Sequence, residues 1–289
     1  MSERRRPTWW KRTRRLVVVV VAIYAVYVVL LTLGQNYAIF PGRVMALNRV
    51  SPPFGVEKWT MPAEGANGDV FAWWMPAAPP EVGPRPVVIF AHGNGEFAEH
   101  NFGLSQLYHA RAVHVLIPEY RGYAGAVGSP SEATLSADMV RWYDRLVSRD
   151  DVDASRVIFH GRSIGGGVMA ATARTREPAA MILESTFTSL ESMAWGRGLP
   201  PFLLRSPMRT RKVVEQLDRP ILFLHGTEDT LIPVSHAHRN LAAARDGRLD
   251  TRPAGHNDLA QDWPWYHGTI LGFLTDTIFA APAHTEGGE

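Results

Sequence analysis

The sequence predicts a doubly wound, mainly parallel α/β sheet, preceded by one transmembrane helix. Three observations support this: short continuous apolar runs, amphipathic segments between them, and one long uncharged run near the amino terminus. Continuous apolar strands indicate a sheet covered on both faces, and their alternation with helical segments is typical of parallel topology. With 289 residues and 46% apolar content, the chain can bury a large core.

The uncharged run is residues 16–33, LVVVVVAIYAVYVVLLTL. As a helix it would be roughly 27 Å long, close to the hydrocarbon thickness of a bilayer, and a helix satisfies its backbone hydrogen bonds internally. Seven of the 30 Lys and Arg residues lie in residues 1–15, which places the amino terminus in the cytoplasm. We therefore predict a basic cytoplasmic tail over 1–15, a transmembrane signal anchor over 16–34, and a catalytic body on the extracytoplasmic side.

A cleaved signal peptide, which would give a secreted form, is the alternative for this segment. Thr32-Leu33-Gly34 offers small residues at the −3 and −1 positions. However, the apolar run exceeds the roughly 7–15 residues of a signal peptide, and no A-x-A site follows it. The signal anchor is the favoured interpretation.

Charge and composition exclude several classes of protein. Beyond residue 15 the chain has 23 basic and 27 acidic residues, so the body is mildly acidic and lacks the electrostatic footprint of a nucleic-acid-binding protein. The absence of cysteine excludes disulfides, thiolate metal sites and a cysteine nucleophile. We expect no nucleic-acid partner, no metal and no cofactor.

The body is predicted to follow a proline-punctuated connector over 35–60 and to occupy 61–280. An alternating segment at 69–76 predicts an early edge strand. Buried strands are predicted from continuous apolar runs at 86–93, 112–120, 156–161, 179–185 and 219–226. Helices are predicted at 131–148, with Ser131 as the N-cap, and at 234–245 and 265–279. Residues 186–212 interrupt this alternation and predict a small lid, and 281–289 predict a flexible tail.

The glycine-rich segment FHGRSIGGG, residues 159–167, distinguishes between two chemistries. A phosphate-binding P-loop needs a lysine where this chain has Gly167, and a G-x-G-x-x-G pattern is absent. The G-x-S-x-G pattern fits from Gly161 to Gly165, between a predicted strand and a predicted helix. Side chains at either glycine would collide with backbone in so tight a turn, which presents the central serine above the sheet. We predict Ser163 as a nucleophile.

A serine nucleophile needs a base and an acid that orients the base. His256 is the favoured base, because RPAGHNDL is a loop between a predicted final strand and the last helix. Asp229 follows a buried strand, and the order Ser163, Asp229, His256 is the one that triads with this turn adopt. Glu228 is expected to point elsewhere, and Glu184 is the alternative acid.

The other histidines are expected to be structural or solvated. His160 and His225 end strands and should be satisfied near the core, whereas His236 and His238 lie on a predicted helix and should be solvated. His267 lies in the last helix and His284 in the tail.

Two backbone amides are predicted to form an oxyanion hole. One is that of Ile164, at the start of the helix, and the other that of Asn94, in the loop FAHGNGEF. The spacing of His92, Glu96 and His100 also raises a metal site as an alternative. Intervening glycines disfavour the helix that this spacing requires, and no H-E-x-x-H motif occurs.

Several motifs together carry a family resemblance: VVIFAHGNGE, PEYRGYAGAVGSPSE, VIFHGRSIGGG, LESTFTSL, LFLHGTEDTLIP and AGHND. Over most of 70–275 the chain resembles the α/β-hydrolase superfamily, in particular α/β-hydrolase-domain proteins with an amino-terminal membrane helix that are related to protein depalmitoylases. The resemblance implies Ser163, Asp229 and His256 as the triad and amides near Asn94 and Ile164 as the oxyanion hole. It departs from the family at Glu119, where many relatives have Asp, at 124–126, and in the Gly-Glu that follows HGN.

These observations predict a membrane-anchored serine hydrolase that cleaves carboxylic esters or thioesters through an acyl-enzyme. Its substrate would be a small or lipid-like acyl compound, because Trp195, Phe202 and Leu203 give the lid an apolar character. A serine peptidase or amidase on the same fold is one alternative. A noncatalytic membrane scaffold is another, which the presence of all three triad residues disfavours.

Overall fold

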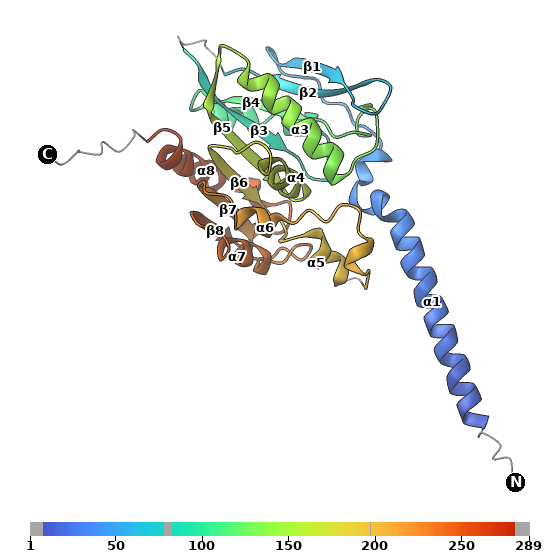
Figure 1. The fold of residues 1–289 in the computed structure, drawn as a ribbon. Coiled ribbons are helices and arrows are strands. Elements are labelled where there is room, and N and C mark those ends of the chain that lie inside the picture. The colour runs from blue at the N-terminus through green and yellow to red at the C-terminus, as the bar shows by residue number, and fades with distance from the viewer. Residues whose placement is uncertain (1–7, 78–82, 197, 281–289) are drawn as a thin grey trace, which may run out of the picture.

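The structure is a computed structural model that describes residues 8–77, 83–196 and 198–280 (Figure 1). The tail predicted over 281–289, which includes His284, lies outside the described residues. So does the part of the basic tail that precedes Thr8.

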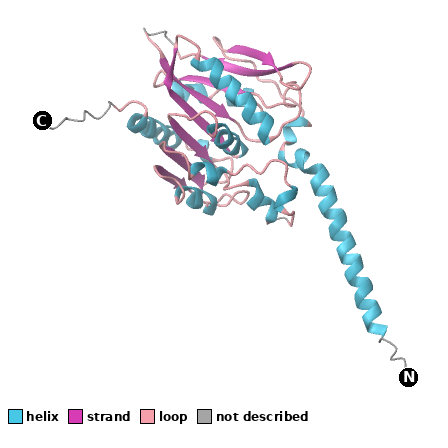
Figure 2. Ribbon diagram, in the orientation of Figure 1, coloured by secondary structure: helices cyan, strands magenta, loops and turns pink. Residues whose placement is uncertain are grey.

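Helix α1, Thr8–Ile39, is one continuous helix that projects from the body (Figures 1 and 2). At about 1.5 Å per residue, its 32 residues extend roughly 48 Å. It begins before the uncharged run, extends into the segment predicted as a connector, and is followed by the 3-10 turn η1, Pro41–Arg43. The part Trp9–Ile39 is long and apolar enough to cross a membrane by length and composition.

Eight strands form one sheet in the order β1-β2-β4-β3-β5-β6-β7-β8. They are β1 Glu57–Pro62, β2 Asp69–Met75, β3 Arg85–Ala91, β4 His114–Pro118, β5 Val152–Arg162, β6 Ala180–Glu184, β7 Ile221–Gly226 and β8 Gly247–Arg252. The strands from β4 through β8 in this order pair in parallel, and β1 and β2 make the antiparallel pairs. The predicted mainly parallel α/β class is confirmed.

The edge of the sheet differs from the prediction. The alternating segment 69–76 forms β2, which is flanked by β1 and β4, and six of its seven residues are buried. The edge strand is β1, which begins within the segment predicted as a connector. Only Trp59 of β1 is buried, where it stacks on Trp74 of β2 with ring centroids 4.7 Å apart. One buried residue in a short polar strand is too weak a pattern to identify from the sequence.

Helices cover both faces of the sheet, and one hydrophobic cluster lies on each face. The helices of the body are α2 Leu104–His109, α3 Glu132–Val147, α4 Ile164–Ala173, α5 Leu190–Trp195, α6 Thr210–Val214, α7 Ser235–Leu241 and α8 Trp263–Thr277. Short 3-10 turns are η2 Ala98–Asn101, η3 Pro201–Leu203 and η4 Leu259–Gln261. Ser131 caps α3 as predicted, because its side chain accepts from the Thr134 N–H.

Parallel strands place their carboxyl ends at one edge of the sheet, where ligands bind in open α/β folds. β3, β5 and β7 all end at this edge, followed respectively by the loop that contains Asn94, by Ser163 and by the loop that contains Asp229. Helix α5 and turn η3 form the segment 190–203 beside this edge, next to the part of α1 nearest the body (Figure 1). The fold thus brings the predicted site residues together.

Candidate active site

Ser163 lies in the turn between β5 and α4 with a backbone φ of 55°, in the left-handed region that is costly for a residue with a side chain. A Cβ at Gly161 would lie 2.5 Å from the Gly165 carbonyl oxygen, and one at Gly165 would overlap the Ala91 carbonyl. Only glycine fits at both positions. The turn is held by a hydrogen bond from the Ser163 N–H to the Glu184 carbonyl, at 2.8 Å.

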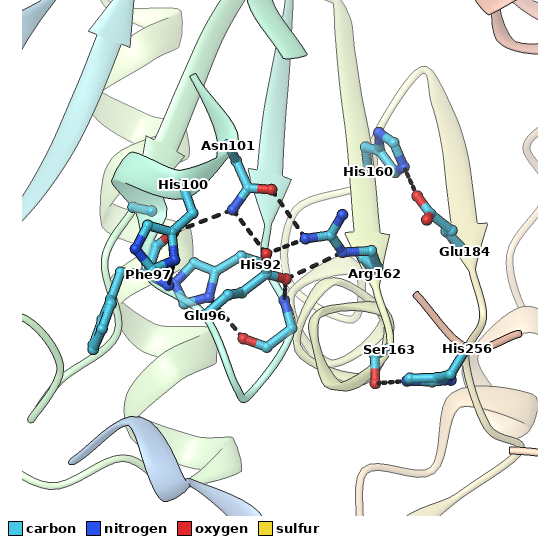
Figure 3. A network of polar contacts seen from close by, with 12 residues as sticks. His92, Glu96, Phe97, His100, Asn101, His160, Arg162, Ser163, Glu184 and His256 are labelled. Carbon is cyan, nitrogen blue, oxygen red and sulfur yellow. Dashed lines mark hydrogen bonds and ion pairs between the residues drawn. The ribbon is translucent and has the colours of Figure 1, made fainter. Parts of the chain in front are cut away.

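Ser163, His256 and Asp229 form one chain of hydrogen bonds. The Ser163 hydroxyl lies 2.9 Å from His256 Nε2 (Figure 3). His256 Nδ1 lies 2.6 Å from Asp229 Oδ2. The serine can donate to Nε2 only if the proton of the neutral imidazole is on Nδ1, where it is donated to the carboxylate. The three segments that carry these residues come from the ends of β5, β7 and β8.

Asp229 is buried and fully hydrogen-bonded. Its Oδ1 accepts the backbone N–H groups of Leu231 and Ile232, at 2.9 and 2.8 Å. His225 Nε2 lies 3.4 Å from Oδ2 and 2.7 Å from the Ile232 carbonyl. Burial raises the pKa of Asp229, but hydrogen bonds from His225, His256 and Ile232 outweigh it and hold the pKa well below its usual range. Asp229 is therefore a carboxylate at any pH at which the histidine can act as a base.

The two competing acids have other roles. Glu228 is exposed, next to buried Asp229. Glu184 is buried, accepts from the Tyr266 hydroxyl at 2.8 Å and lies 3.4 Å from His160 Nε2. Burial opposes its ionisation, yet His160, Arg162 and Tyr266 lower its pKa. Glu184 belongs to a polar cluster below the nucleophile.

The expectation that His236 is solvated is wrong. The side chain is only 7% exposed, because the chain after β6 packs over α7. Its Nδ1 accepts from the backbone N–H of Thr188 at 3.1 Å and also lies 3.1 Å from the Thr188 hydroxyl. Burial and the charge of Arg239 lower the pKa of His236 to about 4, so the ring is neutral at pH 7. His236 therefore anchors the start of the segment that leads to α5. His238 is exposed, as expected.

The two residues predicted to supply oxyanion-hole amides, Ile164 and Asn94, both lie beside Ser163. Ile164 is the first residue of α4, a position whose N–H has no partner within the helix. Asn94 and Ile164 line the same cavity as Ser163. The backbone N–H of Asn94 has no acceptor among the described residues. Both amides are available to an oxygen bound near Ser163.

His92, Glu96 and His100 do not converge on a common point. His92 Nε2 lies 3.0 Å from Glu119 Oε1. His100 Nδ1 accepts from the Phe97 N–H at 3.3 Å (Figure 3). Glu96 is bound to Arg162. In the part of the chain that the structure describes, no three such side chains are arranged to hold a metal ion.

These side chains instead hold the loop that contains Asn94. Glu96 accepts from the Gly93 N–H and forms an ion pair with Arg162, the residue before the nucleophile. Burial raises the pKa of Glu96, but Arg162 and His92 outweigh this effect and lower it. The pair thus connects the loop after β3 to the turn after β5. The sequence does not reveal this pair, because Arg162 occupies a variable position of G-x-S-x-G and Glu96 is 66 residues away in the chain.

Glu119 supports the same loop from below. Its carboxylate accepts the backbone N–H groups of Ala98 and Tyr120, at 3.0 and 2.8 Å, besides its contact with His92. Burial opposes protonation of His92, yet Glu119 and Glu96 raise its pKa. Glu119, at which the chain departs from the family pattern, is therefore a buried hydrogen-bond acceptor that supports this loop.

An apolar cavity of about 380 Å³ adjoins Ser163. Its walls come from α1, from the segment 187–204 and from Leu231 and Ile232 beside Asp229. Cavities of this size, largely apolar with a few polar groups, are typical of small-molecule sites.

A profile of the prolyl oligopeptidase family matches residues 107–254, which include Ser163 and Asp229. The α/β-hydrolase domain-containing protein WAV2 of Arabidopsis thaliana is 30% identical over 230 residues, which cover 73% of this chain and 71% of WAV2.

Two solved structures share the fold. An esterase of Pyrococcus furiosus superposes with a TM-score of 0.63 at 18% identity, over 81% of this chain and 99% of its own. Est1E of Butyrivibrio proteoclasticus, solved with ferulic acid bound, superposes with a TM-score of 0.65 at 18% identity, over 77% of this chain and 100% of its own.

Proposed function

This chain belongs to the prolyl oligopeptidase family of α/β-hydrolases, and from that premise we propose that it is a membrane-anchored serine hydrolase of carboxylic esters or thioesters. The observation that carries the proposal is the hydrogen-bonded chain from Ser163 through His256 to Asp229, beside an apolar cavity. This arrangement supplies a nucleophile, a base and an orienting acid.

In the first step, Ser163 Oγ attacks the substrate carbonyl carbon while its proton passes to His256 Nε2. The carbonyl oxygen takes the negative charge and is bound by the amides of Ile164 and Asn94. When the tetrahedral intermediate collapses, the bond to the leaving alcohol or thiol breaks and His256 returns the proton to that group. An acyl ester on Ser163 remains.

In the second step, water takes the place of the leaving group. His256 removes a proton from the water, whose oxygen attacks the acyl carbonyl, and then protonates Ser163 Oγ as the carboxylic acid leaves. Asp229 stays ionised throughout, because its lowered pKa favours the charged form. It holds the imidazole with its proton on Nδ1 and stabilises the imidazolium that forms in each step.

Labelling with a fluorophosphonate probe tests the proposal. We expect the full-length protein in detergent to be labelled and to hydrolyse p-nitrophenyl esters, and Ser163→Ala to lose both properties. Ser105→Ala is a suitable control, because Ser105 lies on α2, which packs on the face of the sheet opposite α4, and its hydroxyl donates to the Phe102 carbonyl. Equal labelling of wild type and Ser163→Ala, or labelling of neither, would reject the triad and favour a scaffold.

A serine peptidase is the second candidate, because the matching family is named for an oligopeptidase. The same triad cleaves amides when the cavity accommodates a peptide. The apolar lining of the cavity favours an acyl substrate instead. Comparing ester and peptide substrates at matched concentrations distinguishes them: faster turnover of peptides would establish the peptidase.

The membrane arrangement is part of the proposal. We place residues 1–15 in the cytoplasm, the span at 16–34 and the catalytic body outside the cytoplasm, because of the seven cations before the apolar run. A carboxy-terminal reporter that is active only outside the cytoplasm tests this. Activity from a cytoplasm-dependent reporter instead would reverse the orientation.

A further inference from the structure

Helix α1 lines the cavity beside Ser163 along one of its faces. The lining positions are spaced three, four or one residues apart, which places them on one side of a helix. They are Leu30, Leu31, Gly34, Gln35, Ala38 and Ile39. The neighbouring Leu33 and Tyr37 are exposed and do not line the cavity. The helix that is apolar enough to span a membrane is thus also a wall of the candidate active site.

Specific hydrogen bonds hold α1 against the body. Gln35 is 4% exposed; its amide donates to the Leu203 carbonyl at 3.1 Å and its oxygen accepts the Arg205 N–H at 2.7 Å. At the end of α1, the Ile39 carbonyl accepts from the side-chain amide of Asn94 at 3.0 Å. One bond therefore connects α1 to the loop that contains Asn94, and two connect it to Leu203 and Arg205 in the segment predicted as a lid, 186–212.

The lid segment also follows α1 toward the membrane. The Tyr24 hydroxyl donates to the Gly198 carbonyl at 3.0 Å. Tyr24 precedes Gly34 by ten residues, or roughly 15 Å along the helix, and lies in the middle of the uncharged run. Trp195 and Phe202, each close in sequence to a residue that bonds to α1, are 69% and 84% exposed. Large exposed apolar side chains next to a spanning helix indicate a surface in contact with lipid.

Building on the proposed hydrolase activity, we infer that α1 and the lid form a portal through which the acyl chain of a bilayer lipid reaches Ser163 without crossing water. The chain lies along the Leu30–Gly34–Ala38 face of α1, with its carbonyl at Ser163. The helix then acts as a specificity element of the enzyme as well as its anchor.

We expect the residue at position 34 to set the length of acyl chain that the cavity accepts. A Cβ there would meet no atom within 4 Å, so packing does not require glycine. Glycine in a helix interior costs about 1 kcal/mol relative to alanine, so larger residues can be introduced without loss of helix stability. The open space next to Gly34 is part of the cavity. Side chains of increasing size at this position should therefore shorten the acyl chain that fits.

The test uses the full-length protein in phosphatidylcholine vesicles, with p-nitrophenyl acetate and p-nitrophenyl palmitate as probes. In the series Gly34→Ala, Gly34→Leu and Gly34→Trp, we expect palmitate hydrolysis to fall progressively, by tenfold or more for Trp. Acetate hydrolysis and fluorophosphonate labelling should fall much less than palmitate hydrolysis in each variant. Leu33→Trp, one residue away on the exposed face, should preserve both activities.

Equal loss on both esters, or no loss of palmitate hydrolysis in Gly34→Trp, overturns the inference but leaves the hydrolase proposal intact. If the wild type hydrolyses neither ester and is not labelled, the proposed function itself fails. Faster hydrolysis of a palmitoyl-peptide thioester than of palmitate esters in the same vesicles would replace the lipid with a lipidated peptide.

A second measurement does not depend on turnover. An alkyl fluorophosphonate with a photoreactive diazirine near the end of a long chain is bound to Ser163 and then irradiated. We expect crosslinks to the Leu30, Gly34 and Ala38 face of α1, located by peptide mass spectrometry. Crosslinks confined to the body, with none on α1, would contradict the portal.

Discussion

Ser163 lies between two regions that are built in different ways. On the polar side, Asp229 and His256 follow the ends of β7 and β8, and the Glu96–Arg162 pair joins the loop after β3 to the end of β5. The sheet itself therefore fixes their positions. On the apolar side, α1 and the lid are far apart in the sequence and are joined by a few hydrogen bonds such as those of Gln35. Under the proposed function, the sheet positions the catalytic groups, and the separable elements α1 and the lid select the substrate.

The largest effect is expected from Asp229→Asn. The substituted amide would favour the wrong tautomer of His256, so kcat should fall by roughly 10³–10⁴-fold on short and long esters alike. Glu228→Gln is the matched control, because Glu228 is adjacent but exposed, and should retain activity. Steady-state kinetics on both esters checks this. A loss restricted to long esters would mean that Asp229 acts on binding of the acyl chain and not on the catalytic step.

Glu96→Gln should have a smaller effect on the polar side. It leaves Arg162 partly buried without its counter-charge and loosens the loop of Asn94, so we expect kcat to fall roughly 10–100-fold with KM little changed. Asp144→Asn removes an exposed pair with Arg176 and should change neither kcat nor stability by more than a small amount.

The pH dependence distinguishes the role of Glu96. Its pKa in the folded protein is lowered, so its contribution to stability is present above its ordinary pKa and is lost as pH falls through the folded value. The difference in unfolding free energy between wild type and Glu96→Gln should therefore be largest near pH 7 and shrink in acid. A constant difference, measured by denaturant unfolding, would argue against the ion pair.

The sequence predicts the polar side better than the apolar side. The strand-turn-helix context of Ser163 and the chain order of the triad are local signals, so the residues that the structure brings together could be named in advance. The role of Arg162 could not, because it depends on which strands are neighbours in the sheet. The burial of His236 could not be predicted either, since helical periodicity does not reveal what packs on a short helix.

The contact of α1 with the body could not be predicted, because the sequence of α1 is apolar on all sides. A run of valine and leucine fits a bilayer on every face and does not indicate which face contacts the body. The sequence also gives no sign of a separate role for Gly34, the last residue of the predicted span, or for Gln35, the first residue of the predicted connector. Both roles follow only from the docking of α1 against the lid.

Acidification should weaken the contact between His236 and Thr188, which holds the start of the segment that leads to α5. Its folded pKa of about 4 is below the ordinary value, so the protein is destabilised as pH falls from about 6.5 toward 4. Lowering the pH from 7 to 5 should reduce the free energy of unfolding by about 2 kcal/mol through the protonation of His236. His236→Gln keeps an acceptor for Thr188 without titrating and should remove this component, whereas the exposed His238→Gln should not. Thermal unfolding across this pH range measures it.

The smallest effect is expected from Gln35→Leu, which weakens the attachment of α1 to the lid. Gln35→Leu keeps the apolar character of α1 but removes both bonds to the lid, so the wall of the cavity should be less ordered when a chain binds. We expect kcat/KM for p-nitrophenyl palmitate to fall about threefold to tenfold, close to 1 kcal/mol, with hydrolysis of the acetate unchanged. Asn36→Leu is the matched control, because Asn36 contacts Pro130 and not the lid. An equal decrease on acetate would mean that α1 supports the catalytic residues as well, and the two regions could no longer be treated as separable.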